Sequence, residues 1–591
     1  MHLPFYESIL LVSAFSARRF VVMIIHPRLL RTTLGWEFSS IRAHINPVRT
    51  MSQRAVYGLT NIYAEVEIPQ DPNFFHYTRG RFIRDEACEM AGRSISFNVD
   101  ELAIVAASAV GAKACVKFEK YPDGMYNKVF GLTMDNGVQV VAKLPNPNAG
   151  RPHFTTASEV ATMEFMRTVC KIPLPKVHTW SSQNTNSVGA EYIIMEKVSG
   201  VLLDSVWSSM RLDDRFSLTK TIAEYQEAWM KASISHFGSL YFAEDLAGVS
   251  HVPLHDGFSD KKFAVGPSTG REWFHAGRAT VEFNRGPWPS LEEYLAAIGH
   301  REMSCVNDIA QLPKSEIALY GPGTYQPTRN KKLKAIESYL SLIKYICPAG
   351  LSIASPCLWH SDLHVENIYV DPDAPTKIVG IIDWQSTEIA PLFYHARQPY
   401  FLDYDGPQLH GLERPRLPDN FKALGTDAQN EANALYAKQA LAALYRRLIY
   451  KNNRGLYSSL EYQQTASFDL LLLGRNLLVD GEAAYLARIL ELESEWADLP
   501  GVGESQYPFR FLDGEKEEVE RDVNGCLLGM QAMQSIRESL GDLFPEQGIV
   551  RPDQYDEAKF ALSQAKEFII GEFARNEEEK RVWREAWPFD D

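Results

Sequence analysis

Residues 358–385, which read LWHSDLHVENIYVDPDAPTKIVGIIDWQ, are the stretch from which the fold of this chain is predicted. Two short apolar runs, 368–370 and 378–382, lie on either side of Asp371-Pro372-Asp373-Ala374-Pro375. Aspartate and proline favour turns, so the stretch predicts a β-hairpin. Polar residues precede the first strand and follow the second, namely His360, Asp362, His364, Asn367 and Asp383. Pairing of the two strands would bring Asn367 and Asp383 close together.

These polar residues suit phosphoryl transfer. Asn and Asp side chains are hard oxygen ligands of the kind that Mg²⁺ takes when it bridges substrate phosphates. Asp362 precedes Asn367 by the spacing of the catalytic Asp and the metal-binding Asn in the kinase catalytic loop, and Asp383 would replace the Asp of the kinase D-F-G element. A Zn²⁺ site made of His and Asp is the alternative, but it leaves Asn367 and the second strand unexplained.

The stretch resembles the H-x-D-L-H-x-x-N … I-D-W signature of the aminoglycoside phosphotransferase and choline kinase-like family. The residues that match in order and spacing are His360, Asp362, Leu363, His364, Asn367, Ile382, Asp383 and Trp384. Ser361 and Glu366 depart from the usual pattern, and neither change removes a catalytic group. The resemblance implies that Asp362, His360 and His364 are catalytic. It also implies that Asn367 and Asp383 hold the metal.

Residues 101–200 have the pattern of a kinase-like N-terminal lobe. Strands are expected on either side of a glycine-containing turn and of the Asn-Gly turn at 135–137. In a kinase the first turn covers the nucleotide phosphates, and here Gly124, Asn127 and Gly131 are the candidates. Lys143, at the end of the third strand, matches the V-A-I-K lysine, which contacts the α and β phosphates.

A helix and a hinge should complete the nucleotide site. The helix is predicted to have Thr156 or Ser158 as its cap. Either Glu159 or Glu164 should pair with Lys143, and the family position favours Glu159, in the first turn of the helix. The buried strand 192–196 resembles the strand that leads into the kinase hinge. There Met195 and Val198 are expected to bind the edge of the nucleotide base.

The predicted fold class is α+β, a two-lobed protein kinase-like fold with a helical C-terminal extension. The expected parts are a mitochondrial targeting leader (1–54), an N-terminal extension (55–100), the N-lobe (101–200), the C-lobe with the catalytic hairpin and an insertion (201–425), and a helical C-terminal region (426–591). Residues 246–330 are rich in Pro, Gly and Trp, which indicates either a surface embellishment or a lid over the acceptor site. The aromatic and acidic residues after Asp383 suit core packing, or a cationic amine acceptor.

Composition sets further limits. The first 54 residues carry seven arginines, no lysine and two acids, which is typical of a mitochondrial transit peptide. The arginines interrupt every apolar run short of the roughly 18 residues that a membrane span needs, so no transmembrane segment is expected. A net charge of −15 argues against nucleic-acid binding. Seven scattered cysteines without a C-x-x-C motif indicate reduced thiols.

The expected function is Mg²⁺-dependent transfer of the γ-phosphate of ATP or GTP to a hydroxyl of a small-molecule acceptor, by an aminoglycoside phosphotransferase-like kinase. A mitochondrial nucleotide-binding pseudokinase or scaffold with little or no turnover is the alternative. The joint presence of Lys143, Asp362, Asn367 and Asp383 favours the enzyme. Within the family, the leader, the loop 127–130 and the long tail look most like the fungal altered inheritance of mitochondria protein 9 group. The sequence does not determine the acceptor or the oligomeric state.

Overall fold

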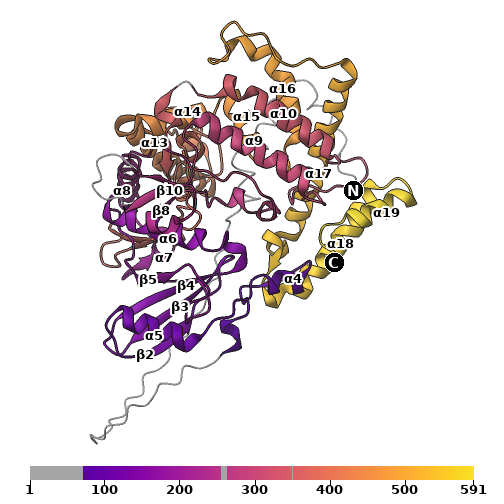
Figure 1. Ribbon diagram of the computed structural model, residues 1–591. Coiled ribbons are helices and arrows are strands. Elements are labelled where there is room, and N and C mark those ends of the chain that lie inside the picture. The colour runs from indigo at the N-terminus through magenta and orange to yellow at the C-terminus, as the bar shows by residue number, and fades with distance from the viewer. Residues whose placement is uncertain (1–70, 255–261, 349, 591) are drawn as a thin grey trace, which may run out of the picture.

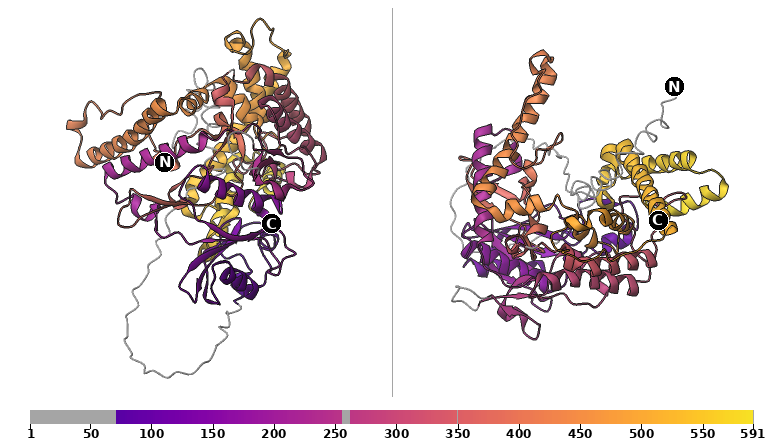
Figure 2. Two further views of the ribbon diagram at one scale, coloured as in Figure 1. Left: turned by 60° about the vertical axis from the view of Figure 1, so that its left-hand side comes forward. Right: turned by 90° about the horizontal axis from the view of Figure 1, so that it is seen from above.

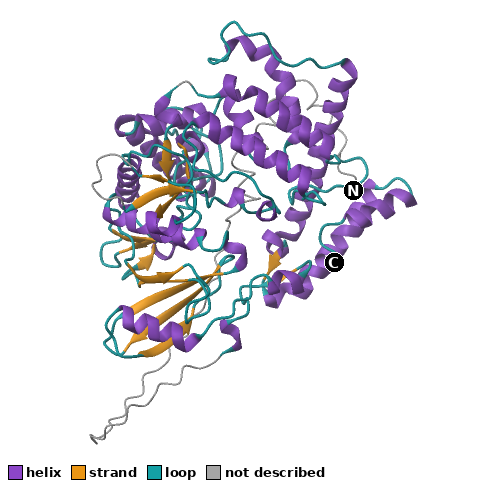
Figure 3. Cartoon of the chain, in the orientation of Figure 1, coloured by secondary structure: helices purple, strands orange, loops and turns teal. Residues whose placement is uncertain are grey.

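The computed structural model describes residues 71–254, 262–348 and 350–590. The predicted leader, 1–54, and the first part of the N-terminal extension lie outside these residues. The fold class is confirmed, because two lobes that contain both sheets and helices are followed by a mainly helical region (Figure 1). Strands gather in the two lobes and helices make up most of the rest (Figure 3).

The N-lobe is built on a five-stranded antiparallel sheet of order β2-β3-β4-β6-β5. Its strands are β2 (Cys115–Lys120), β3 (Asn127–Met134), β4 (Gln139–Pro145), β5 (Val177–Ser181) and β6 (Tyr192–Glu196). The predicted Asn-Gly turn joins β3 to β4, with Gly137 in the left-handed region at φ 83°. Helix α5 (Val99–Ala109) packs on one face of the sheet, and α6 (Phe154–Thr168) packs on the other.

The C-lobe carries the predicted hairpin. Strands β12 (Ile368–Val370) and β13 (Ile378–Ile381) pair antiparallel, and β7 (Val201–Leu202) adds a third strand beside β12. A second small sheet pairs β11 (Pro356–Leu358) with β14 (Ile389–Pro391). The short helices of this lobe are α7 (Leu203–Trp207), α11 (Leu351–Ala354) and α12 (Leu392–His395).

A tryptophan cluster lies under the hairpin. Trp229, on α8 (Leu212–Met230), meets Trp359 and Trp384 edge-on, with ring centroids 5.6 and 5.8 Å apart. All three indoles are buried. The buried side of α8 therefore packs against the segments that precede and follow the hairpin.

The insertion at 246–330 is part of the core, so its interpretation as a surface embellishment is wrong. Trp273 and Trp288 are only 1% and 2% exposed, and their ring centroids lie 4.7 Å apart. The elements of this region, with the strand that precedes it, are β8 (Ser239–Phe242), β9 (Val252–Pro253), β10 (Phe263–Gly266) and α9 (Leu291–Asp308). Helix α9 packs along α10 (Arg329–Ile346), and α6 of the N-lobe packs on β8. The insertion thus joins the two lobes.

The region after residue 425 is mainly helical, as expected. Its helices are α13 (Thr426–Asn452), α14 (Arg454–Tyr462), α15 (Ala466–Gly474), α16 (Glu482–Glu495), α17 (Asp513–Leu540), α18 (Tyr555–Phe573) and α19 (Glu577–Ala586). Helix α13 runs beside α8 and projects from the body of the molecule (Figure 2), whereas α15 and α16 pack on α10. These helices therefore extend the C-lobe.

The N-terminal extension reaches the C-terminal helices. Strand β1 (Arg81–Phe82) pairs antiparallel with β15 (Ile549–Val550), and α4 (Glu86–Ala91) lies near α18 in Figure 1. The Arg81 guanidinium lies 3.5 Å from the centre of the Tyr555 ring, where a cation–π contact is favourable. Within the described residues, no helix is both long and apolar enough to cross a membrane.

Candidate active site

Three segments that are far apart in the sequence meet at Lys143. Its ammonium nitrogen lies 2.6 Å from Glu159 Oε1 and 2.9 Å from Asp383 Oδ1. Lys143 and Glu159 are buried, whereas the Asp383 side chain is 34% exposed. A buried charge persists only when it is paired, so this ion pair fixes α6 and the end of the hairpin against the N-lobe sheet.

The charges at this meeting point stabilise one another. Burial lowers the pKa of Lys143, but the charges of Asp383 and Glu159 outweigh burial and raise it above its usual value. Burial likewise opposes ionisation of Asp383, and Lys143 outweighs it, so the pKa of Asp383 is lowered. Both groups are charged at neutral pH. Asp383 is therefore an anionic, partly exposed group beside the Lys143–Glu159 ion pair.

The helix that carries Glu159 does not begin where the sequence predicts. Helix α6 begins at Phe154, after His153 at φ 67°, with no side-chain cap hydrogen bond, so the prediction of Thr156 or Ser158 as the cap is wrong. The Thr156 hydroxyl instead donates to Glu191 Oε2 at 2.5 Å. Because the helix begins early, Glu159 lies in its second turn.

Only one of the two candidate glutamates on α6 pairs with Lys143. Glu159 forms that pair, whereas Glu164 pairs with Arg167 at 2.8 Å and with Lys262 at 3.4 Å. The choice depends on which face of α6 meets the sheet. The buried residues Val160 and Met163 are part of that face.

Asp362 lies at the centre of a hydrogen-bond network. The Asn367 amide nitrogen donates to the Asp362 carbonyl at 2.9 Å and to its Oδ2 at 3.2 Å. His364 Nε2 lies 3.2 Å from the same Oδ2. The other carboxylate oxygen, Oδ1, is buried and has no hydrogen-bond partner among the described residues. The network therefore fixes the orientation of the Asp362 carboxylate through one oxygen only.

His360 joins the catalytic loop to the second hairpin strand. Its Nδ1 accepts the Asp362 backbone N–H at 3.2 Å, so Nε2 carries the proton and donates to the Ile382 carbonyl at 2.8 Å. Burial lowers the pKa of this histidine. A neutral ring with both nitrogens bonded to the backbone holds the loop in place. By contrast, burial lowers the pKa of His364, but its bond to Asp362 outweighs burial and raises it.

The hairpin brings Asn367 and Asp383 together as the sequence predicts. Ile368 faces Ile381 in the register, and the Ile382 N–H donates to the Asn367 carbonyl at 3.0 Å. Asp383 itself has φ 63°, in the left-handed region that costs a non-glycine residue about 1 kcal/mol or more. The buried Trp384 indole donates to the Ile381 carbonyl at 3.2 Å and helps to hold this conformation.

The mouth of the hairpin fits Mg²⁺. The Asn367 amide nitrogen is engaged by Asp362, which leaves the amide oxygen for a cation, and Asp383 adds a carboxylate. Among the described residues, no three His, Cys, Asp or Glu side chains are grouped so that they could hold a metal ion. Two protein oxygens suit Mg²⁺, which takes its remaining ligands from phosphates and water.

The glycine turn is built differently from the prediction. The Asn127 side chain is bonded within the protein, because its amide exchanges two hydrogen bonds, 3.0 and 2.9 Å long, with the Gln385 amide. Gly131 lies within β3 under the Tyr121 side chain, and a Cβ at this position would be 2.5 Å from the Tyr121 hydroxyl. Gly131 therefore makes room for Tyr121, and Gly124 is the glycine that lies in the turn itself.

The buried Asp123 carboxylate, next to Gly124, also stabilises this turn. Asp123 Oδ2 lies 2.8 Å from the Lys120 ammonium and 3.2 Å from that of Lys128, and it accepts the Thr78 backbone N–H at 2.8 Å. Burial lowers the pKa of Lys128, and the charge of Asp123 opposes this change. Lys128 thus supports the turn, and the N-terminal extension supplies part of that support.

The predicted hinge residues differ in their surroundings. Met195 is buried within β6 and is paired on both sides, with Val141 and with Val177. Val198 follows the strand and packs against Gly380 of β13. The connection after β6, rather than Met195 itself, is therefore the segment that runs between the lobes.

A family profile and a fungal relative match this chain. The profile of the "Phosphotransferase enzyme family" matches residues 325–395, which contain Asp362, Asn367 and Asp383. The predicted resemblance to the phosphotransferase family is confirmed. A subtelomeric hrmA-associated cluster protein of Aspergillus fumigatus is 29% identical over 509 residues, which are 81% of this chain and 97% of that protein.

Two further comparisons are more distant. The mitochondrial protein "altered inheritance of mitochondria protein 9" of Yarrowia lipolytica is 22% identical over 507 residues, 80% of this chain and 86% of that protein. Among solved structures, the aminoglycoside phosphotransferase APH(4)-Ia matches with a TM-score of 0.33 and 11% identity, over 72% of this chain and 99% of that one.

The hairpin is followed by aromatic residues that pack inward. Phe393 and Tyr404 are buried, and Phe401 meets Trp207 edge-on at 5.0 Å between centroids. The Arg397 guanidinium lies 3.3 Å from the centre of the Tyr400 ring. Core packing therefore accounts for most of these aromatic residues, and Arg397 already covers one face of the Tyr400 ring.

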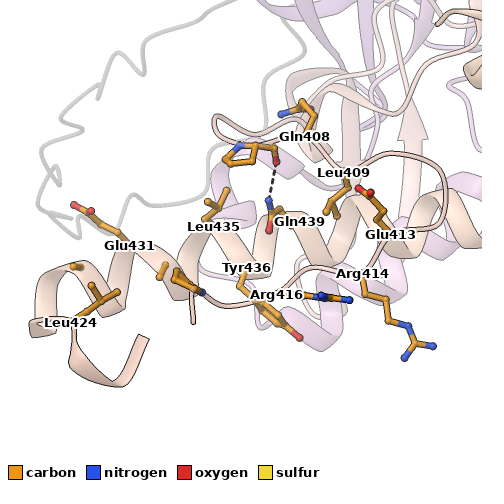
Figure 4. A pocket seen from close by; sticks show the side chains of 14 residues that line it. Gln408, Leu409, Glu413, Arg414, Arg416, Leu424, Glu431, Leu435, Tyr436 and Gln439 are labelled. Atoms are coloured by element: carbon orange, nitrogen blue, oxygen red, sulfur yellow. Dashed lines mark hydrogen bonds between the residues drawn. The ribbon is translucent and has the colours of Figure 1, made fainter. Parts of the chain in front are cut away.

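A separate hollow of about 830 Å³ lies between the chain at 407–418 and α13 (Figure 4). Residues of both charges line it: Arg414 and Arg416 lie on the loop, and Glu431 lies on α13. The Gln439 amide spans it and donates to the Pro407 carbonyl at 2.9 Å. None of the predicted site residues lines this hollow.

Proposed function

We propose that this protein is a Mg²⁺-dependent phosphotransferase that moves the γ-phosphate of ATP or GTP to a hydroxyl of a small molecule. The observation that carries the proposal is the buried ion pair of Lys143 with Glu159 and with Asp383, at 2.6 and 2.9 Å. The Lys143–Glu159 pair is the arrangement that an active kinase needs before it can hold nucleotide phosphates, and Asp383, the proposed metal ligand, lies beside it. A pseudokinase typically lacks one member of this set, which makes the enzyme the better explanation.

The nucleotide would lie between the lobes. Lys143 would contact the α and β phosphates, with Glu159 holding the lysine in place. Gly124, in the turn before β3, would lie over the phosphates. The base edge would meet the connection after β6, where Val198 lies. Asn127, Gly131 and Met195 would support the shape of the site without touching the nucleotide, because their contacts are made within the protein.

The acceptor hydroxyl would meet Asp362. Oδ1 of this carboxylate has no partner among the described residues, and it is the oxygen that would accept the hydroxyl proton. The hydroxyl oxygen then forms a bond to the γ-phosphorus, and the bond from that phosphorus to the oxygen that bridges it to the β-phosphate breaks, which releases the nucleoside diphosphate. Asn367 and His364 orient the base through Oδ2.

The remaining site residues would hold or position these groups. Asn367 and Asp383 would bind Mg²⁺, which neutralises the charge that develops on the transferred phosphate. His360 is a positioning residue, because both of its ring nitrogens are bonded to the backbone of the catalytic loop and the hairpin. The site would thus be shared between the N-lobe (101–200) and the C-lobe (201–425).

A direct test combines binding with turnover. Purified protein is incubated with ATP or GTP, with and without Mg²⁺, and its melting temperature is recorded. Ligand at a hundredfold above its dissociation constant should raise stability by about 2.7 kcal/mol. Release of nucleoside diphosphate is then measured against a panel of hydroxyl-bearing metabolites, including sugars, amino sugars and amino alcohols. Absence of any Mg²⁺-dependent nucleotide shift would contradict the proposal.

A further inference from the structure

The insertion brings an arginine to the glycine turn. Arg271 begins the 3-10 helix η4 (Arg271–Trp273), and its guanidinium carbon lies 3.6 Å from the centre of the Tyr126 ring. His275 stacks on the same tyrosine, with ring centroids 5.6 Å apart. Tyr126 immediately precedes β3. The insertion therefore contacts the N-lobe where the proposed nucleotide phosphates would lie.

The backbone of this arginine is firmly held. The buried Glu388 accepts a hydrogen bond from the Trp273 indole at 2.8 Å and from the Ser268 hydroxyl at 2.9 Å. Gly270 lies so close that a Cβ there would be 2.7 Å from Glu388 Oε2. Glu388 follows Asp383 closely in the chain, so the segment that carries Arg271 is fastened to the segment that carries the proposed metal ligand.

Arg271 comes from a region outside the family match at 325–395. Tyr126, on which it stacks, immediately precedes Asn127, and the Asn127 amide exchanges two hydrogen bonds with the amide of Gln385, two residues after Asp383. Arg271 therefore adds a second cation beside the turn that is joined to the Asp383 segment.

The guanidinium has unused hydrogen-bonding capacity. Its Nη1 is buried and makes no hydrogen bond to any described residue. A buried donor left without an acceptor costs about 1–3 kcal/mol. Asp383 Oδ1 is already engaged by Lys143 at 2.9 Å. A guanidinium in this position matches the geometry of a phosphate, whose oxygens accept two of its N–H groups at once.

We propose that Arg271 binds a phosphate oxygen of the nucleotide, so that the insertion contributes a residue to the nucleotide site. The inference rests on the proposed function and extends it. Stacking on Tyr126 pre-orders the arginine, and the anchor at Glu388 keeps it near Asp383. Arg271 would supplement Lys143 and the proposed Mg²⁺ in neutralising the phosphates.

The test compares nucleotides that differ only in their phosphates. Wild type, Arg271→Met and Arg271→Lys are titrated calorimetrically with ATP, ADP, AMP and adenosine in the presence of Mg²⁺, or with the guanine series if GTP is preferred. Methionine retains the apolar contact with Tyr126 but removes the charge. Arg211→Met is the matched control, because Arg211 is a surface residue with a 79% exposed side chain.

We expect Arg271→Met to lose about 10- to 100-fold in affinity for ATP and to bind adenosine as wild type does. Arg271→Lys, which keeps the charge and also serves if Arg271→Met fails to fold, should show a smaller, phosphate-dependent loss. Equal affinity of both variants and wild type for ATP overturns the inference alone, as does an equal loss for ATP and adenosine. Wild-type protein that binds none of these ligands overturns the proposed function, and the inference with it.

Discussion

Asn127 and Gln385 exchange two amide hydrogen bonds, 3.0 and 2.9 Å long, across 258 positions of sequence. The pair joins the beginning of β3 in the N-lobe to the residue that follows Asp383-Trp384 in the C-lobe. Gln385 is 6% exposed, so its amide depends on this partner. The two lobes are therefore connected beside the proposed metal site as well as through the polypeptide.

This pair should behave as a unit in unfolding experiments. Asn127→Leu and Gln385→Leu should each lower the free energy of unfolding by about 1–3 kcal/mol, because each leaves the other amide, half-buried in Asn127 and buried in Gln385, without its partner. The double variant should lose clearly less than the sum of the two. Urea denaturation measures all three, with the exposed Gln139→Leu as the control. Strict additivity would show that the two amides do not stabilise each other.

Two aspartates of the hairpin should separate catalysis from binding. Asp362→Asn should lower kcat by about 10²–10⁴-fold and leave nucleotide affinity nearly unchanged, since an amide keeps the shape but cannot accept the proton. Asp383→Asn should weaken Mg²⁺-dependent nucleotide binding as well as turnover, because it removes a charge from the metal site. Both are titrated with nucleotide and Mg²⁺ and assayed for turnover. Full activity of Asp362→Asn, or equal loss of binding in both variants, would contradict the assigned roles.

The ion pair of Lys143 should matter for stability. Lys143→Met leaves Glu159 buried without its counter-charge and should lower the free energy of unfolding by about 3 kcal/mol. The double variant Lys143→Met, Glu159→Leu should recover much of this loss, although nucleotide binding should stay impaired. Denaturant titration gives both values. Glu164→Gln, in a surface pair, should change stability by less than about 1 kcal/mol. A double variant as unstable as the single one would refute this account.

His395 should make stability depend on pH. Burial lowers its pKa from 6.5 to about 3, and its Nε2 accepts the Ala390 N–H at 3.2 Å. The folded protein thus favours the neutral ring, so the stabilisation is fully present above pH 6.5 and is lost as the pH falls toward 3. Between pH 7.5 and 5 the loss should be about 2 kcal/mol. The free energy of unfolding, measured by denaturation across this range, should change less steeply with pH in His395→Gln than in wild type. The exposed His251→Gln should keep the wild-type slope.

Residues 1–54 are predicted to act as a mitochondrial targeting leader. Relatives named as mitochondrial proteins match this chain at 21–23% identity, which agrees with the arginine-rich residues 1–54. We expect these residues, fused to a fluorescent reporter, to carry it into mitochondria and to be cleaved there. Microscopy and N-terminal sequencing of the imported reporter measure both events. A version with the seven arginines replaced by glutamine is the control. A wild-type fusion that stays in the cytosol would refute the expectation.

The hairpin at 368–381, the strands of the N-lobe and the helical character of the C-terminal part could all be predicted from the sequence. Each of these depends on signals that act over about ten residues: alternating apolar residues, turns made by Asp, Pro and Asn-Gly, and motif spacing. The proximity of Asn367 and Asp383 follows from the same local pairing. It could therefore be predicted without knowledge of any other part of the chain.

The long-range partners of the site residues became known only from the tertiary structure. The start of α6 depends on contacts of His153 with Ser182 and Asp245, and these override the local capping signal of Thr156 and Ser158. The link of Asn127 to Gln385 and the place of Arg271 over Tyr126 join segments more than a hundred positions apart. Such contacts depend on how the lobes and the insertion pack, and no local pattern of the sequence encodes them.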